Sequence, residues 1–248
     1  MKRTLDANSI KIIAITAMTI DHIAWLLFPG YSYHVVPVLL HIIGRITCPV
    51  MCYFIAEGFH HTKNIDRYTL RLFVFSFISH FAYIFFFGYQ DWKSFIPFYY
   101  GDILNQTSIM WPLAWGLVML RIAYSEKIKE GLKPALIIGI CLITFPSDWS
   151  CIASLCILAF GTNRGNLKKQ MLWMTFYVAM YSAVYFFAID PVYGLLQMAV
   201  ALSIPVISMY NGQLSKGRRR NRIVKYAFYI YYPLHLFLMG WIQAIYML

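Results

Sequence analysis

Long apolar runs, repeated along the whole chain, are the feature that most constrains the fold. Nine can be read, at 10–28, 35–59, 68–88, 107–123, 134–146, 149–161, 170–189, 192–209 and 225–247. Most reach the ~20 residues that an α-helix needs to cross the hydrocarbon core of a bilayer. Hydrophobic residues make up 60% of the 248 residues, more than a soluble domain of this size can bury. The sequence predicts an all-α, polytopic integral membrane helix bundle with about nine transmembrane segments, and a single transmembrane domain over 1–248.

The basic residues predict how the chain is oriented. Nineteen of the 21 Lys and Arg residues fall in clusters between alternate apolar segments, at 2–11, 63–71, 121–133, 164–169 and 216–225. Cytoplasmic loops carry the excess of Lys and Arg, so we expect the N-terminus inside and, after nine crossings, the C-terminus outside. The net charge of +11 then reflects topology and contact with anionic lipids, and no nucleic acid is expected as a partner. The predicted location is the cytoplasmic (inner) membrane.

Two of the apolar segments, 134–146 and 149–161, are short and are separated by Pro146-Ser147-Asp148. One broken helix across both would violate the charge alternation, so a short helical hairpin is favoured. Its tip, with Asp148, is expected to enter the membrane, where irregular backbone survives only against protein or a water-filled cavity. The first apolar segment is interpreted as a retained helix and not a signal peptide. The five cysteines fit neither zinc nor redox spacing, so they are expected to pack and no metal site is predicted.

Ionisable residues inside the apolar segments are the strongest functional signal, because such groups usually face the interior of a helix bundle. Asp21 and His22 interrupt the first segment, Arg45 lies in the second, Glu57 lies near its cytoplasmic end, and His235 follows Pro233 in the last. We predict that Asp21, His22, Arg45 and His235 converge at mid-membrane in a partly buried site with perturbed pKa values, and that Glu57 lines its inner mouth. Two alternatives stay open. Asp21 and Arg45 could form a purely structural ion pair, and Asp21 and His22 diverge around a helix, so only one need face the cavity.

A basic rim is predicted at the cytoplasmic mouth of the same bundle. His60, Lys63, Arg67 and Arg71 follow Glu57 closely, and clustered cations suit a phosphate-bearing cofactor. His60 and His61 are interpreted as interfacial residues and not as metal ligands. His41 lies one turn before Arg45 on the same helix face, and is interpreted as a polar residue near a loop.

Several stretches resemble the TraX family. They are Ile10-Lys11-Ile12-Ile13-Ala14-Ile15 through Asp21-His22, Gly44-Arg45-Ile46-Thr47-Cys48-Pro49, Ala56-Glu57-Gly58-Phe59-His60-His61-Thr62-Lys63-Asn64, Arg67-Tyr68-Thr69-Leu70-Arg71-Leu72, and Tyr229-Ile230-Tyr231-Tyr232-Pro233-Leu234-His235-Leu236. The last is also similar to the end of broader membrane acyltransferases. The resemblance covers most of the chain and is strongest at its two ends.

The resemblance implies a multi-spanning acetyltransferase that uses acetyl-CoA as co-substrate, in a family named for acetylating the N-terminal amine of pilin. It implies functional roles for Asp21-His22, Arg45, Glu57 and His235. Acyl transfer needs a general base and a group that stabilises negative charge. We hypothesise His22 as the base with Asp21 beside it, Arg45 as the stabiliser, His235 as the alternative base, and the basic rim as the holder of the CoA phosphates.

The acceptor is left open between a peptide amine, a glycan hydroxyl and a small molecule, and the oligomeric state is left open too. Two other function classes remain possible from the sequence. A proton-coupled transporter or lipid flippase would use Asp21, Arg45, Glu57 and His235 as a relay. A non-catalytic membrane scaffold would explain the hydrophobicity but would leave these charges without a task.

Overall fold

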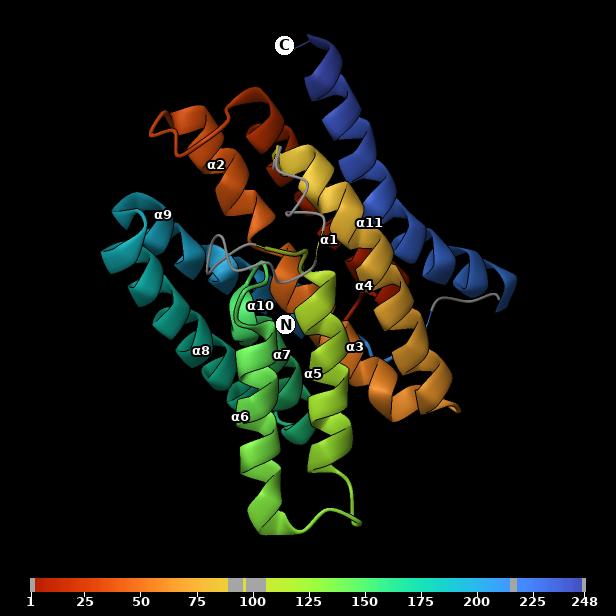
Figure 1. Cartoon of the computed structure of the whole chain (residues 1–248). Helices are drawn as coiled ribbons and strands as arrows, with labels where there is room; N and C mark the ends of the chain where they lie inside the picture. The colour runs from red at the N-terminus through yellow and green to blue at the C-terminus, as the bar shows by residue number, and fades with distance from the viewer. Residues whose placement is uncertain (1–2, 89–95, 97–105, 215–217, 247–248) are drawn as a thin grey trace. The chain divides into compact units, whose positions relative to one another are not determined.

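The computed structural model describes residues 3–88, 96, 106–214 and 218–246, and the regular secondary structure of these residues is entirely helical (Figure 1). Lys2, Lys93, Asp102 and Lys216 lie outside the described residues. The helices, in chain order, are α1 (Ala7–Leu27), α2 (Val35–Gly44), α3 (Thr47–His61), α4 (Ile65–Phe87), α5 (Met110–Ala123), η2 (Glu130–Leu132), α6 (Lys133–Thr144), α7 (Ser150–Thr162), α8 (Leu167–Ala188), α9 (Pro191–Leu196), η3 (Gln197–Leu202), α10 (Ser203–Ser208) and α11 (Arg218–Tyr246).

Each predicted apolar segment coincides with a helix or with a run of consecutive helices. Two of the segments are interrupted, which the sequence did not predict. The segment 35–59 is divided into α2 and α3 by a turn at Arg45 and Ile46, and the segment 192–209 passes from α9 through the 3₁₀ helix η3 into α10. A 3₁₀ stretch inside a longer helical run often marks a functional position or local strain.

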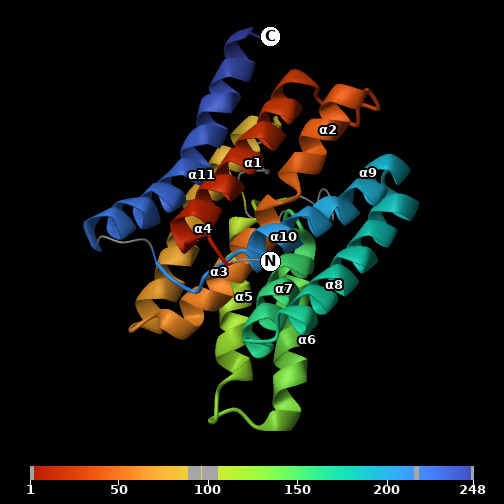
Figure 2. The ribbon, with the colours of Figure 1, turned by 180° about the vertical axis from the view of Figure 1, so that it is seen from behind.

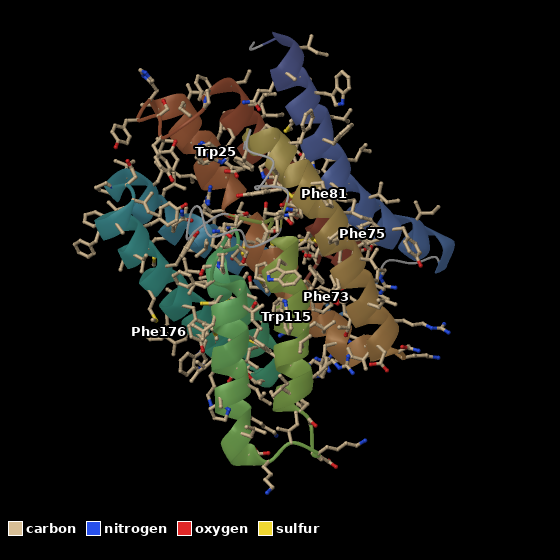
Figure 3. The ribbon with its side chains drawn as sticks, viewed as in Figure 1. Trp25, Phe73, Phe75, Phe81, Trp115 and Phe176 are labelled. Carbon is tan, nitrogen blue, oxygen red and sulfur yellow. The ribbon has the colours of Figure 1, made fainter. Side chains whose placement is uncertain are left out.

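Several helices have the length and surface of membrane spans. Among the described residues, five are long and apolar enough to cross a bilayer: Ala7–Leu27, Val35–His61, Ile65–Phe87, Leu167–Ala188 and Pro191–Ser208. Large apolar side chains point outward from them, as Phe176 does on α8 (Figure 3), and an outward apolar face suits lipid. The chain is therefore a multi-pass membrane protein in contact with lipid. The count of nine crossings and the orientation of the termini stay predictions.

The chain divides into two compact units. Unit 1 contains residues 1–54 and 163–228, and unit 2 contains residues 55–162 and 229–248. The helices α3 and α11 each begin in unit 1 and end in unit 2. That the whole chain is a single transmembrane domain stays a prediction.

Unit 1 is built on two packed helix pairs. In the first, α1 packs against α2, and the Thr47 hydroxyl donates to the Ala14 carbonyl at 3.0 Å, which fastens the start of α3 to α1. In the second, α8 packs against α9 and η3, as seen from behind in Figure 2. Gly194 makes this close approach possible, because a Cβ there would lie 2.6 Å from the Phe186 backbone. The α2 helix contacts both α9 and η3, so the two pairs meet along α2.

Unit 2 contains the predicted hairpin. Helices α6 and α7 pack together and are joined by 145–149 (Figure 1), so the helical hairpin is confirmed, while its depth in a membrane is untested. The turn is fixed to the residues just before α5, where the Asp148 N–H donates to the Thr107 carbonyl at 2.9 Å. Between α5 and α7, the Ser154 hydroxyl donates to the Pro112 carbonyl at 2.6 Å, a close approach of the kind that small residues permit in membrane helices.

Candidate functional site

A cluster of charged and polar side chains lies inside unit 1, where α1, α2 and η3 meet. One carboxylate oxygen, Oδ1 of Asp21, contacts two groups of α2 and its C-cap: Nδ1 of His41 at 2.9 Å and Nη2 of Arg45 at 3.2 Å. The second guanidinium nitrogen, Nη1 of Arg45, donates to Oε1 of Gln197 at 3.1 Å. His41 is fully buried, and the Asp21 and Arg45 side chains are only 14% and 10% exposed. These residues form a compact polar cluster that is almost fully shielded from solvent.

Each member of the cluster is positioned by an identifiable feature of the backbone. His41 and Arg45 lie one turn apart, so both point to the same side of α2, as the sequence predicts. Arg45 stands at the turn that ends α2, and Gln197 is the first residue of η3. Both interruptions of the apolar helices therefore contribute a polar side chain to the cluster. Irregular backbone at membrane depth is tolerated where it is buried in protein or lines a cavity.

Gly44 allows α1 and α2 to approach closely enough for these contacts. A Cβ at this position would lie 2.4 Å from both Cβ and Oδ1 of Asp21. Real Cβ atoms do not come this close to other heavy atoms, because dispersion contacts between carbons are best at about 3.5–4.0 Å. Only glycine fits at this point without moving Asp21.

An aromatic cluster continues from the charged centre toward the loop between α1 and α2. Trp25 lies on α1 near α2 (Figure 3), with its ring centroid 4.6 Å from that of His41. Tyr193 of α9 lies 5.5 Å from His41 and 5.9 Å from Trp25, and Tyr31 of the loop lies 4.7 Å from Tyr193. The rings cover the buried imidazole and extend to Tyr31, which is 42% exposed.

The loop between α1 and α2 is tied to the first turn of α9. The hydroxyl of Tyr33 donates to Asp190, whose carboxylate also caps α9 by accepting from the Tyr193 N–H at 2.8 Å. The hydrogen bond to Asp190 raises the pKa of the Tyr33 phenol, and burial raises that of Tyr31. Both phenols therefore stay protonated at neutral pH and act as hydrogen-bond donors at this end of unit 1.

Comparisons with known proteins agree with the sequence resemblance. The family model described as TraX protein matches residues 6–243 of the chain. The chain belongs to the TraX family. It is 28% identical, over 247 residues, to a protein of Dichelobacter nodosus named "Probable fimbrial assembly protein FimC, serogroup H1", and the alignment covers 96% of this chain and 97% of that protein. No solved structure matches the chain.

In this TraX protein, the predicted catalytic residues are divided between the two units. Asp21, His22 and Arg45 belong to unit 1, whereas Glu57 and His235 belong to unit 2. Asp21 and Arg45 form the ion pair that the sequence suggests, and the histidine that hydrogen-bonds the carboxylate is His41. His22 is half-buried on α1. His41, interpreted from the sequence as a polar residue near a loop, lies in the last turn of α2 and is completely buried.

The ionisable residues at the end of α3 have partners within unit 2. Glu57 Oε2 lies 3.3 Å from Nε2 of His61, one turn further along the helix. His60 places Nε2 3.2 Å from the carbonyl of Gly161, which also accepts from the Tyr124 hydroxyl at 2.9 Å. A backbone carbonyl can only accept, so this nitrogen of His60 donates. These contacts connect α3 and α5 to the end of α7.

The residues of the predicted basic rim differ in their exposure to solvent. Lys63 and Arg67 are exposed. Arg71 is half-buried, and its guanidinium lies over the rings of Tyr68 and Tyr229, 5.4 and 5.3 Å from their centroids. Arg71 thus contributes to the packing of α4 against α11.

Two further histidines of unit 2 are buried among polar groups. His235 of α11 donates from Nδ1 to the Tyr231 carbonyl at 2.8 Å, and its ring stacks on that of Tyr231 at 5.0 Å. His80 of α4 lies with Nδ1 3.0 Å from the Thr107 hydroxyl, beside the α6–α7 turn. In that turn, Trp149 and Ser150 have positive φ, 61° and 47°, a strained conformation for residues other than glycine.

Proposed function

We propose that this TraX protein is a membrane-embedded acetyltransferase that moves an acetyl group from acetyl-CoA to an amine or hydroxyl acceptor. The observation that carries the proposal is the buried Asp21–His41–Arg45 cluster. It combines an imidazole, a carboxylate that orients it and a permanent cation in one place shielded from water. A general base and a charge stabiliser are the two groups that acyl transfer from a thioester requires.

In the proposed reaction, the acceptor nitrogen or oxygen attacks the thioester carbonyl of acetyl-CoA. A new bond to the carbonyl carbon forms, the C–S bond breaks, the acceptor proton passes to a histidine base, and CoA leaves as the thiol after taking a proton. Arg45 stabilises the negative charge that develops on the carbonyl oxygen. The sequence predicts His22 as the base, with His235 as the alternative.

The proposed acetyl-CoA site is the basic rim of Lys63, Arg67 and Arg71, together with His60. The exposure of Lys63 and Arg67 supports this assignment, because a nucleotide phosphate needs accessible cations. The rim faces the cytoplasm in the proposed topology, which has nine crossings of the inner membrane with the N-terminus inside and the C-terminus outside. Glu57, near the same end, is proposed to line the inner mouth.

The proposed acceptor is the amine of a peptide that is assembled into a surface fibre. The similarity to a protein named as a probable fimbrial assembly protein supports this choice, and a glycan hydroxyl or a small molecule is the alternative. The two kinds of acceptor share one requirement, which is the removal of an N–H or O–H proton as the new bond forms.

A second candidate function, a proton-coupled transporter or lipid flippase, is favoured by one specific observation. Two apolar segments of unit 1 are interrupted, at Arg45–Ile46 and through η3, and the side chains of Arg45 and Gln197 are hydrogen-bonded to each other there. Discontinuous membrane helices with polar groups at the break are frequent in transporters.

One experiment separates the two candidates. The purified protein is incubated with acetyl-CoA labelled in the acetyl group, with and without a peptide amine, and the release of free CoA thiol is followed. The acetyltransferase proposal predicts saturable binding of acetyl-CoA and transfer of label to the peptide. Neither binding nor CoA release, in protein shown to be folded, would favour transport.

A further inference from the structure

The imidazole of His41 is held in one orientation and is left with one unfilled hydrogen-bonding position. Its Nδ1 faces Oδ1 of Asp21 at 2.9 Å. Its Nε2 is buried and has no hydrogen-bond partner among the described residues. Buried polar atoms are nearly always satisfied, and each exception calls for an explanation such as a catalytic role or a bound group.

The contacts of Asp21 fix which nitrogen of His41 carries the proton. Arg45 is always protonated, and its guanidinium at 3.2 Å keeps the Asp21 carboxylate ionised. An ionised carboxylate only accepts hydrogen bonds, so Nδ1 must carry a hydrogen and donate it. In the neutral ring Nε2 then has a lone pair and no proton. This is the arrangement by which an aspartate prepares a histidine for general-base catalysis in hydrolytic triads.

We infer that Nε2 of His41 is the proton-accepting position of the transfer site, and that it takes the N–H of a primary amine or the O–H of an alcohol acceptor. The inference rests on the proposed acetyltransferase function and assigns its base to a residue different from His22. It accounts for the buried nitrogen without a partner, because the acceptor supplies the missing donor when it binds.

Every proton that moves in the proposed step has a named donor and a named acceptor. As the acceptor nitrogen or oxygen bonds to the thioester carbon, its proton moves to Nε2, and the imidazolium that forms is stabilised by the Asp21 carboxylate at Nδ1. The departing thiolate of CoA then takes that proton and returns His41 to the neutral form. Arg45 remains charged throughout and stays bound to Gln197.

In this proposal, the aromatic rings around His41 line the acceptor's route to Nε2. Trp25 and Tyr193 lie against the imidazole, with Tyr31 beyond Tyr193. Tyr31 is 42% exposed, whereas Tyr193 and His41 are almost fully buried. An acceptor that enters from the Tyr31 loop therefore meets apolar ring faces first and the base last, which strips water from the amine or alcohol before the proton moves.

The experiment uses two replacements of His41 that keep different halves of the ring. His41→Asn places an amide N–H near the position of Nδ1, so it retains the bond to Asp21 and removes the base. His41→Gln places its amide near the position of Nε2 and loses the bond to Asp21. His34→Asn is the matched control, because His34 is an exposed residue at the N-cap of the same helix.

The readout is CoA release from acetyl-CoA in the full-length protein, with ethylamine, with trifluoroethylamine and with water alone as acceptor. We expect His41→Asn to lower the rate with ethylamine by about 10²–10⁴-fold, the range for loss of a general base, with acetyl-CoA binding within threefold of the wild type. The defect should be smaller with trifluoroethylamine, which is already unprotonated at neutral pH and needs less help from a base. A purely structural role for His41 would lower both rates equally. His34→Asn should behave as the wild type.

Four results would overturn the inference. Ethylamine acetylation by His41→Asn within threefold of the wild-type rate, or an equal loss with both amines, excludes His41 as the base. A larger loss with ethylamine than with trifluoroethylamine in His22→Asn, but not in His41→Asn, assigns the base to His22. Absence of CoA release by the folded wild-type protein with every acceptor, water included, removes the acetyltransferase proposal itself and the inference with it.

Discussion

Replacing Gly44 with alanine tests whether the close approach of α1 and α2 holds the site together. The added Cβ would stand 2.4 Å from the Asp21 Cβ and 2.5 Å from its Cγ, whereas carbon atoms in good contact are about 3.5–4.0 Å apart. Either α2 must move away by about 1 Å, or the Asp21 side chain must turn out of its position. Both responses separate the carboxylate from His41 and Arg45.

The size of the effect depends on which response the protein takes. Overpacking that is relieved by a small helix shift lowers the free energy of unfolding by about 1–3 kcal/mol. Displacement of Asp21 would leave Arg45 without its buried counter-ion, and breaking a buried pair in this way costs about 3–5 kcal/mol. Since alanine is the better helix former by about 1 kcal/mol, the steric loss must exceed that gain to appear as destabilisation.

Gly139→Ala in α6 is the matched control, because a Cβ there meets nothing within 4 Å. The two variants are compared by thermal unfolding in one detergent, followed by circular dichroism, and by CoA release. We expect Gly139→Ala to be as stable as the wild type or slightly more stable, and Gly44→Ala to unfold at a lower temperature with reduced CoA release. Equal stability of the two variants would refute the claim that Gly44 is needed for the contact between Asp21 and α2.

Three other predictions concern the charged groups. Asp21→Asn should lower the free energy of unfolding by about 3–5 kcal/mol, and adding Arg45→Met should restore part of that loss, which a double-mutant cycle on unfolding midpoints measures. Arg67→Ala should weaken the binding of acetyl-CoA in equilibrium dialysis while leaving thermal unfolding unchanged, and unaltered affinity would leave the basic rim as a topology signal only. Asp190→Ala should destabilise the protein by about 1 kcal/mol through loss of the α9 N-cap, whereas Asp190→Asn, which can still cap, should cost much less in the same unfolding assay.

Hydropathy predicted the helices well because length and apolar composition are local properties of the chain. The hairpin of α6 and α7 also followed from local features, namely the Pro146-Ser147-Asp148 turn and the charge alternation. The interruptions at Arg45 and at Gln197 were not predicted, because hydropathy averages over a window and does not register one turn of altered backbone. Such interruptions depend on neighbouring helices that supply hydrogen-bond partners to the freed groups, and these partners are known only from the structure.

The composition of the charged site was predicted in part. The pairing of Asp21 with Arg45 followed from the high energy of unpaired charges in an apolar helix. The sequence places His41 near a loop, but the distance along the chain from that loop says nothing about the helix that His41 packs against. The helical period did place it on the face of Arg45, so the signal that could have identified it was already present in the spacing.

The hydrogen-bond partners of the ring nitrogens set His41 apart from His60 and His235. Nε2 of His60 lies within hydrogen-bonding distance of a carbonyl of α7, and Nδ1 of His235 within that of a carbonyl one turn earlier in its own helix. A purely structural ion pair would need only Asp21 and Arg45, and an apolar side chain at position 41 would pack beside them without a buried polar atom. The imidazole of His41 instead leaves Nε2 buried without a partner, which is unfavourable for stability alone. In the proposed mechanism, an acceptor supplies the donor that Nε2 of His41 lacks, while Asp21 orients the other ring nitrogen.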